Sequence, residues 1–190
     1  ITNKVTTNGN LVFESGSSLL QTTNVQNQGT IVYKRTTKIN RFDLTYWSSP
    51  VTGELDTFKM KDLSSETLFD KFFTYSPTGG WATNMYGMAE MERGKGYSIR
   101  GPQSFDTQTP ADFTGEFKGR PNNGDITVPS VVPDKWFLLG NPYPSAIDVD
   151  ALWDANADQL GALYFWTHVA PPTKAPGENT YRYASNDYVV

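Results

Sequence analysis

The chain of 190 residues contains no cysteine and a single histidine. Without cysteine it can form no disulfide, no thiolate zinc site and no iron–sulfur cluster, and it has no cysteine nucleophile. A single histidine also argues against most metal centres and catalytic triads. The sequence therefore predicts a protein with no metal ion, no cofactor and no catalytic activity.

Basic residues are fewer than acidic ones: 16 Lys and Arg stand against 20 Asp and Glu, which gives a net charge of −4. A mildly acidic chain with no basic run is a poor candidate for binding nucleic acid or anionic lipid. No stretch reaches the roughly 18 apolar residues that a membrane-spanning helix needs. We therefore expect neither a nucleic-acid partner nor membrane insertion.

What the chain has in quantity is aromatic and small polar residues. Aromatic residues make up 14% of it, charged residues only 19%, and there are 16 Gly and 12 Pro. Neutral polar residues, glycine and proline suit turns, and aromatic residues suit strands, so this composition favours an all-β fold over helices. The high aromatic fraction also argues against a disordered segment.

Residues 1–40 consist of short strand-like runs separated by Asn, Gly and Ser. The runs are residues 10–13, 18–21 and 29–33. Runs this short do not make stable hairpins alone. We predict that residues 1–40 form a β-solenoid-like or strand-addition extension, with an ordinary meander as the alternative.

Residues 41–190 carry longer aromatic strands between turn signals such as Gly79-Gly80 and Asn123-Gly124. The expected strands are residues 42–47, 68–75, 97–100, 113–118, 125–128, 136–139, 162–167 and 181–190. Many strands at this spacing predict an antiparallel, jelly-roll-like β-sandwich. One short helix is expected to start after Asp148, whose carboxylate can cap free amide groups.

Two proline-containing turns, at Pro50 and Pro144, are each followed by an aromatic run about two dozen residues later. The first copy continues into a strand at Gly94-Lys95-Gly96-Tyr97, whereas the second reaches Val190 without one. If the two copies are related, a strand of the second copy lies beyond Val190. We therefore expect the sandwich module to be truncated at its C-terminus.

The string Gly140-Asn141-Pro142-Tyr143-Pro144-Ser145 predicts a rigid corner that leads to the helix at Asp148. Two prolines fix φ near −65° and remove two amide donors, so strand pairing must end at Leu139. Asn141 can bond nearby backbone. A structural role for these residues is the main interpretation, and a displayed Tyr143 that contacts a ligand is the alternative.

This string, together with Tyr46-Trp47-Ser48-Ser49-Pro50-Val51 and Gly94-Lys95-Gly96-Tyr97, resembles modules of large secreted and cell-surface proteins of the Bacteroidota. Such adhesin-like proteins often end in a type IX secretion sorting domain. The resemblance implies an extracellular, cell-surface location and a structural or adhesive role without catalytic residues. The implied partners are the rest of a longer chain of the same protein and a surface glycan or another protein.

A carbohydrate-binding module is the alternative function, because sugar-binding modules use exposed aromatic rings as stacking platforms. Among the five tryptophans, Trp81 follows two glycines and lies near Tyr86, so it is the best candidate for an exposed platform. Trp81, Tyr86 and Tyr143 are therefore the expected ligand contacts. The acidic stretch after Asp148 does not match a calcium loop, because Gln159 and Phe165 stand where that loop needs Gly and Glu.

Overall fold

The computed structural model describes residues 3–53, 57–128, 132–167, 173, 176–177 and 187–189. The chain forms two compact units, Ile1–Ile147 and Asp148–Val190. This division differs from the boundary expected near residue 40. The reason is that β2 (Ile31–Ile39) pairs along its whole length with β8 (Ala111–Pro121), so the N-terminal residues share a sheet with the centre of the chain.

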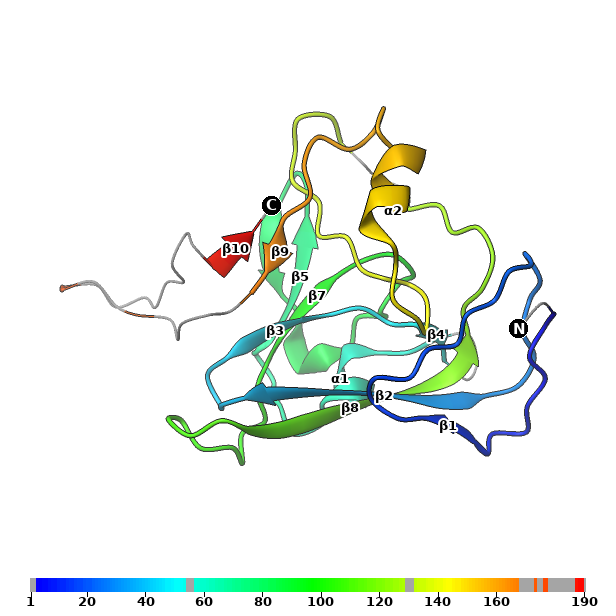
Figure 1. Ribbon diagram of the computed structural model, residues 1–190. Helices are drawn as coiled ribbons and strands as arrows, with labels where there is room; N and C mark the ends of the chain where they lie inside the picture. The colour runs from blue at the N-terminus through cyan, green and yellow to red at the C-terminus, as the bar shows by residue number, and fades with distance from the viewer. Residues whose placement is uncertain are drawn as a thin grey trace. The chain divides into compact units, whose positions relative to one another are not determined.

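The first sheet of unit 1 has the strand order β1-β2-β8-β4, where β1 is Leu11–Phe13 and β4 is Val51–Thr52 (Figure 1). The ladder between β2 and β8 is antiparallel, and β4 also pairs antiparallel with β8. The pair of β1 and β2 is parallel and in register. Parallel stacking of short strands is the pairing that the solenoid-like interpretation of the N-terminal runs predicts.

The second sheet of unit 1 is antiparallel, with the order β3-β7-β5-β6 (Figure 1). Its strands are Leu44–Trp47, Tyr97–Arg100, Phe72–Ser76 and Gly80–Thr83, in that order. The hairpin between β5 and β6 turns at residues 77–79, where the sequence predicts a turn, and Gly80 has the positive φ of +70° that suits glycine.

The core of unit 1 lies between these two sheets. One face of each sheet supplies it, since Ile31 and Phe117 come from the first sheet and Phe72 and Ile99 from the second, all of them 2% exposed or less. Trp47 packs on Phe117 with a ring separation of 6.1 Å. Truncating a buried ring of this kind costs about 3–5 kcal/mol. The prediction of an all-β antiparallel sandwich is confirmed.

Helices are short in the part of the chain that the structure describes. They are α1 (Met60–Leu63), the 3-10 helix η2 (Met85–Gly87) and α2 (Val149–Ala155). The predicted start of α2 is confirmed, because the Asp148 carboxylate accepts a hydrogen bond from the Ala151 amide at 3.1 Å. No helix among the described residues combines the length and the apolar character that crossing a bilayer requires.

Three of the expected strands, residues 18–21, 125–128 and 136–139, are not strands in the structure, and the last of them has only the isolated bridge of Leu139 with Lys95. Next to the first two of these segments, a side-chain amide and not a strand ladder joins the chain: Asn123 Nδ2 donates to the Thr23 and Val25 carbonyls at 2.7 Å each. Asparagine competes with strand pairing in this way because its side chain satisfies the backbone directly. In residues 18–21 Leu19 is buried but Leu20 is 66% exposed, so the apolar residues there do not form a fully buried strand.

Unit 2 contains α2 and a two-stranded antiparallel sheet of β9 (Phe165–Trp166) and β10 (Tyr188–Val189). The Trp166 and Tyr188 rings meet edge to face at 4.9 Å. Val190, on which the expected truncation depends, lies outside the described residues, so the missing strand stays a prediction.

The Gly-Asn-Pro-Tyr-Pro-Ser string forms the predicted corner. Leu139 makes an isolated antiparallel bridge with Lys95, and pairing ends there, as the two prolines require. Asn141 closes the corner by accepting from the Tyr143 amide at 2.9 Å and donating to the Ser145 carbonyl at 2.6 Å. A Cβ on Gly140 would lie 2.5 Å from the Lys95 carbonyl oxygen, so only glycine fits.

This corner also ties distant segments of unit 1 together. The Leu19 amide donates to the Pro144 carbonyl at 2.7 Å, which joins the corner to the N-terminal coils. Asn122, which is 6% exposed, donates through its backbone to the Pro50 carbonyl and through its side chain to the Pro142 carbonyl. The two proline turns that the sequence analysis paired therefore converge on one buried asparagine.

Candidate functional site

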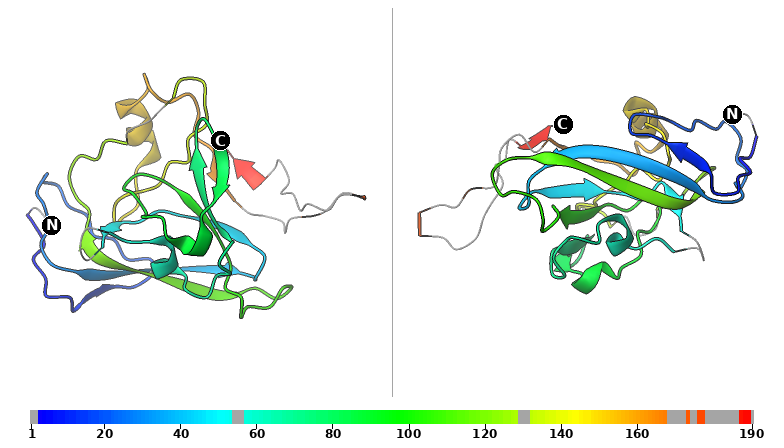
Figure 2. Two further views of the ribbon diagram at one scale, coloured as in Figure 1. Left: turned by 180° about the vertical axis from the view of Figure 1, so that it is seen from behind. Right: turned by 90° about the horizontal axis from the view of Figure 1, so that it is seen from below.

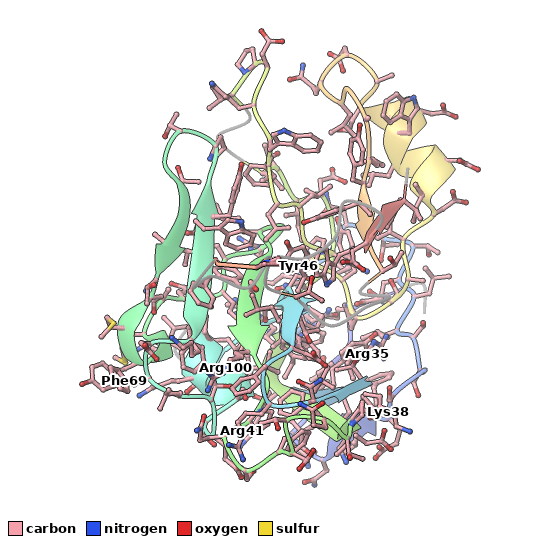
Figure 3. All side chains as sticks on the ribbon, turned by 90° about the vertical axis from the view of Figure 1, so that its left-hand side faces the viewer. Arg35, Lys38, Arg41, Tyr46, Phe69 and Arg100 are labelled. Carbon is pink, nitrogen blue, oxygen red and sulfur yellow. The ribbon has the colours of Figure 1, made fainter. Side chains whose placement is uncertain are left out.

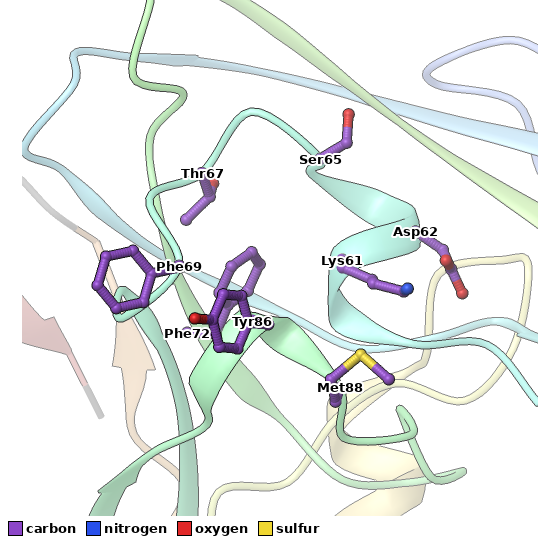
Figure 4. A pocket seen from close by; sticks show the side chains of 8 residues that line it. All are labelled: Lys61, Asp62, Ser65, Thr67, Phe69, Phe72, Tyr86 and Met88. Atoms are coloured by element: carbon purple, nitrogen blue, oxygen red, sulfur yellow. The ribbon is translucent and has the colours of Figure 1, made fainter.

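An open groove of about 640 Å³ lies between α1, the segment that leads into β5, and η2 (Figure 4). Its lining residues are Lys61, Asp62, Ser65, Thr67, Phe69, Phe72, Tyr86 and Met88. All belong to unit 1. The groove brings an apolar floor and a polar rim together on one side of the second sheet.

Tyr86 enters the groove from an uncommon backbone conformation. Its φ of 61° and ψ of 13° place it in the left-handed region, which costs a residue other than glycine on the order of 1–3 kcal/mol. The Tyr86 amide donates to the Phe69 carbonyl at 2.6 Å, and this bond joins the two walls of the groove. Strain that the fold holds in place in this manner points to a functional role for the side chain.

Asn84 fixes the loop that carries Tyr86. The Asn84 amide donates to the Phe72 carbonyl at 2.7 Å, and its side-chain oxygen accepts from the Ala89 amide at 2.8 Å. Gly87 follows with a φ of +61°, and a Cβ there would lie 2.9 Å from the Phe72 ring. The chain can therefore pass close to the buried Phe72 ring only because residue 87 is glycine.

The rings of Phe69 and Tyr86 stack on each other, with centroids 5.4 Å apart and planes 29° apart. The two residues stay 45% and 63% exposed, and Phe69 points outward from the ribbon in Figure 3. Below them Phe72 is only 2% exposed and forms the floor. Met88, 47% exposed, adds a flexible apolar wall.

The rim of the groove is polar, and part of it is already engaged. The Asp62 carboxylate accepts from the Lys59 amide at 2.9 Å, and the Thr67 hydroxyl donates to the Arg100 carbonyl at 2.7 Å. In the described part of the chain, no hydrogen bond or ion pair occupies the Lys61 ammonium or the Ser65 hydroxyl. These two groups can therefore donate to a bound molecule.

Trp81, the first choice of the sequence analysis, lies in a different aromatic cluster. Its ring is 5.8 Å from the Tyr46 ring and 5.2 Å from the Tyr75 ring. Tyr46 and Trp81 sit on the two outer strands of the second sheet, which β7 and β5 separate, so the rings must lean across a face about 14 Å wide. Trp81 is 47% exposed, and Ser98, on β7 between them, is 1% exposed.

Tyr143 makes a structural contact. Its hydroxyl donates to the Gly124 carbonyl at 2.7 Å, which links the corner to the turn after β8. Burial raises the pKa of Tyr143, and the nearby Asp125 carboxylate adds to the effect. The structure thus separates the three expected ligand contacts: Tyr86 lines the groove, Trp81 belongs to the second cluster, and Tyr143 supports the corner.

Phe69, the partner of Tyr86, was not among the expected ligand contacts. Residues 68–75 were expected to form one strand, but β5 starts at Phe72 and the preceding residues turn, with the Lys71 amide donating to the Leu68 carbonyl at 2.9 Å. Asp70, a frequent turn residue, interrupts the aromatic run and was the available signal.

The described residues contain no group of three or more His, Asp or Glu side chains that could hold a metal ion. Comparison with known proteins identifies the family to which the chain belongs. Residues 1–190 match the family described as Domain of unknown function (DUF8693). The chain belongs to this family. No curated protein and no solved structure matches the chain, so the groove is a candidate site of the DUF8693 family on its geometry alone.

Proposed function

We propose that this chain is a non-catalytic adhesive module of an extracellular protein, and that it binds a saccharide in the groove between Phe69 and Tyr86. The observation that carries the proposal is the exposed, stacked pair of these rings beside a polar rim. Aromatic faces that remain open to solvent favour sugar binding, whereas fully buried rings would favour a purely structural role.

The groove supplies both kinds of contact that a sugar uses. The C–H faces of a pyranose pack on Phe69 and Tyr86, and its hydroxyl groups accept from Lys61 and Ser65 on the rim. The loop that carries Tyr86 is held by the hydrogen bond that the Tyr86 amide donates to the Phe69 carbonyl and by the one that the Ala89 amide donates to the Asn84 side chain. A site that is rigid before binding loses less conformational freedom on binding, which favours affinity.

The absence of catalysis is part of the proposal. Glycoside hydrolysis needs two carboxyl groups about 5 to 10 Å apart across the scissile bond. Among the described lining residues Asp62 is the one carboxylate, and it already caps the start of α1 through the Lys59 amide. This arrangement supports binding without turnover.

The extracellular location rests on the resemblance of the Gly140–Ser145 corner and its companion motifs to secreted and cell-surface proteins of the Bacteroidota. It is tested by treating intact producing cells with a protease and following the full-length protein by immunoblotting. Loss of the protein from intact cells is expected. Protection until the cells are lysed would contradict a surface location.

A purely structural role is the second candidate, and the corner favours it. Backbone and side-chain hydrogen bonds from Leu19, Asn122 and Tyr143 converge there and join segments far apart in the sequence. Such a scaffold would resist proteolysis and hold neighbouring parts of a longer protein, with no ligand of its own.

The two candidates are separated by a glycan-array screen of the purified chain, followed by titration calorimetry of the best binder. Saturable binding is expected, and Tyr86→Ala or Phe69→Ala should weaken it by about tenfold or more, as removing a central aromatic contact does. Phe42→Ala is the matched control, because Phe42 is 50% exposed outside the groove.

Trp81→Ala tests the other aromatic cluster in the same assay. We expect it to leave saccharide binding within about twofold of the parent, since Trp81 does not line the groove. If Trp81→Ala abolishes binding and Tyr86→Ala does not, the site is misplaced. If no glycan binds at all, the structural role takes precedence.

A further inference from the structure

A ten-residue pattern occurs twice near the N-terminus, at residues 5–14 and 25–34. Both copies have valine first, glycine fifth, an aliphatic residue and a valine at seventh and eighth, then an aromatic and a charged residue. The corresponding residues are Val5 and Val25, Gly9 and Gly29, Leu11 and Ile31, Val12 and Val32, Phe13 and Tyr33, Glu14 and Lys34.

The structure stacks the two copies in register. Leu11 pairs with Ile31, twenty positions further on, in the parallel ladder of β1 and β2. The charged residues that end the two patterns have opposite signs, and the Lys34 ammonium lies 3.2 Å from the Glu14 carboxylate. Residues 5–14 and 25–34 are therefore two successive coils of a solenoid, which we name the lower coil and the upper coil.

The two coils differ in what covers them. In the first sheet β2 lies between β1 and β8, whereas β1 is the outermost strand and, among the residues that the structure describes, pairs with β2 alone (Figure 2). Ile31 of the upper coil is fully buried, but Leu11 at the same position of the lower coil is 39% exposed and the next residue, Val12, is 45% exposed. The free edge of β1 carries side chains that a neighbour buries in the upper coil.

Gly9 and Gly29, at the same position of the two coils, also differ in what lies beside them. Both have positive φ, +95° at Gly9 and +79° at Gly29. A Cβ on Gly29 would lie 1.7 Å from the carbonyl oxygen of Thr7, because the lower coil packs directly against it. At Gly9 no atom lies within 4 Å of the Cβ position. The lower coil thus has the glycine that a coil beneath it would need, facing open space.

We propose that the free edge of β1 accepts a third coil of this pattern, paired in parallel and supplied by the same polypeptide on the N-terminal side of residue 5. In the observed pair each coil is joined to the next in cis, with the N-terminal coil lying outside the C-terminal one. A second molecule could pair edge to edge through its own β1, but that would end the sheet and would not continue the twenty-residue stack. The third coil makes the lower coil an attachment surface within a longer solenoid, a role independent of the groove at Tyr86.

The test inserts a second copy of residues 5–24 directly before Val5, which keeps the twenty-residue spacing. The inserted coil is expected to pair with β1, so that amide exchange at residues 11–13 slows by about tenfold or more relative to the parent. The matched control carries serine at the inserted positions that correspond to Leu11, Val12 and Phe13. Equal exchange rates in insert and control would overturn the proposal.

A second measurement does not depend on exchange. Gly9→Ala is expected to lower the unfolding midpoint more in the protein with the inserted coil than in the parent, because the new Cβ would meet the inserted backbone. Equal effects in both proteins would count against the third coil. Sedimentation of the parent tests the other occupant, a second copy of the chain. A parent dimer whose exchange protection at residues 11–13 disappears when the dimer is diluted to monomer would place that second copy on β1 and overturn the proposal.

Discussion

Two loops of this protein are built around the same Asn-x-Tyr sequence and do opposite things with the tyrosine. In one, Asn141 bonds the backbone on both sides of a proline, and the Tyr143 hydroxyl donates to Gly124. In the other, Asn84 closes a turn through Ala89, and Tyr86 stands 63% exposed over a groove.

The difference lies in the residue that follows the tyrosine. Pro144 disfavours helical backbone at Tyr143, and the Tyr143 side chain turns back to the fold, where its hydroxyl meets the Gly124 carbonyl. Tyr86, followed by Gly87, takes a left-handed conformation that turns it outward. The same asparagine turn can therefore stabilise the fold or display a side chain.

The largest expected effect is at the corner. Gly140→Ala places a Cβ 2.5 Å from the Lys95 carbonyl oxygen and 2.4 Å from Ser48 Cβ, and we expect a loss of about 3 kcal/mol or more in the free energy of unfolding. Urea denaturation measures it. Gly161→Ala, with no atom within 4 Å, is the control and should change stability by less than about 1 kcal/mol.

The next largest expected effect is a loss of stability at alkaline pH, caused by the buried Tyr97. Tyr97 is 4% exposed, and burial raises its pKa to about 12 from an ordinary value of 10.0. The folded state thus favours the neutral phenol. Its stabilising contribution is fully present below pH 10 and is lost as pH rises from 10 to 12, by about 2–3 kcal/mol in all.

Urea denaturation at a series of alkaline pH values checks this expectation. In Tyr97→Phe the contribution of residue 97 to the decline should disappear, although the variant also loses the hydroxyl bond to the Glu90 carbonyl and starts from a lower stability. An identical alkaline decline in both proteins would show that other groups cause it.

The two asparagines should differ by about a factor of two. Asn141→Ala removes two side-chain hydrogen bonds and is expected to cost about 2 kcal/mol, whereas Asn84→Ala removes one and should cost about 1 kcal/mol. The second variant should also weaken saccharide binding, because it releases the loop that holds Tyr86. Equal losses of stability would contradict the distinction between the loops.

The smallest expected effect is the difference in stability between removing the hydroxyl of Tyr143 and removing that of Tyr86. Tyr143→Phe is expected to cost about 1 kcal/mol for the bond to Gly124, and Tyr86→Phe less than about 0.5 kcal/mol. Thermal unfolding of the pair measures the difference. A larger loss at Tyr86 than at Tyr143 would reverse the assignment of structural and displayed roles.

Local signals in the sequence predicted the elements that depend on few neighbours. The cap at Asp148, the end of pairing at Leu139 and the turn before Gly80 all follow from the residue itself and its immediate context. The strand Tyr97–Arg100 was also predicted with its observed bounds. Each of these rests on backbone rules that hold whatever the rest of the chain does.

The predictions that were wrong concern elements whose structure depends on residues far away in the sequence. Residues 125–128 have the pattern of a strand, but the side chain of Asn123 binds residues 23 and 25 a hundred positions away, and no pattern within one segment reveals that. The groove was not predicted, for the same reason. Phe69 and Tyr86 meet because a turn at Asp70 and a left-handed residue at 86 coincide in space.

The ladder between β2 and β8 has a consequence for how the protein is made. It pairs Ile39 with Ala111 and Ile31 with Gly119, so the first sheet cannot close before more than half of the chain has been synthesised. Contacts this distant in sequence slow folding to milliseconds or longer, because a large loop must be ordered before they form. The parallel coils at residues 5–14 and 25–34 are local and can form early. A nascent chain would therefore present a finished pair of coils in which the edge of β2 that later pairs with β8 is still open, so this edge of a β-branched strand most needs protection during translation.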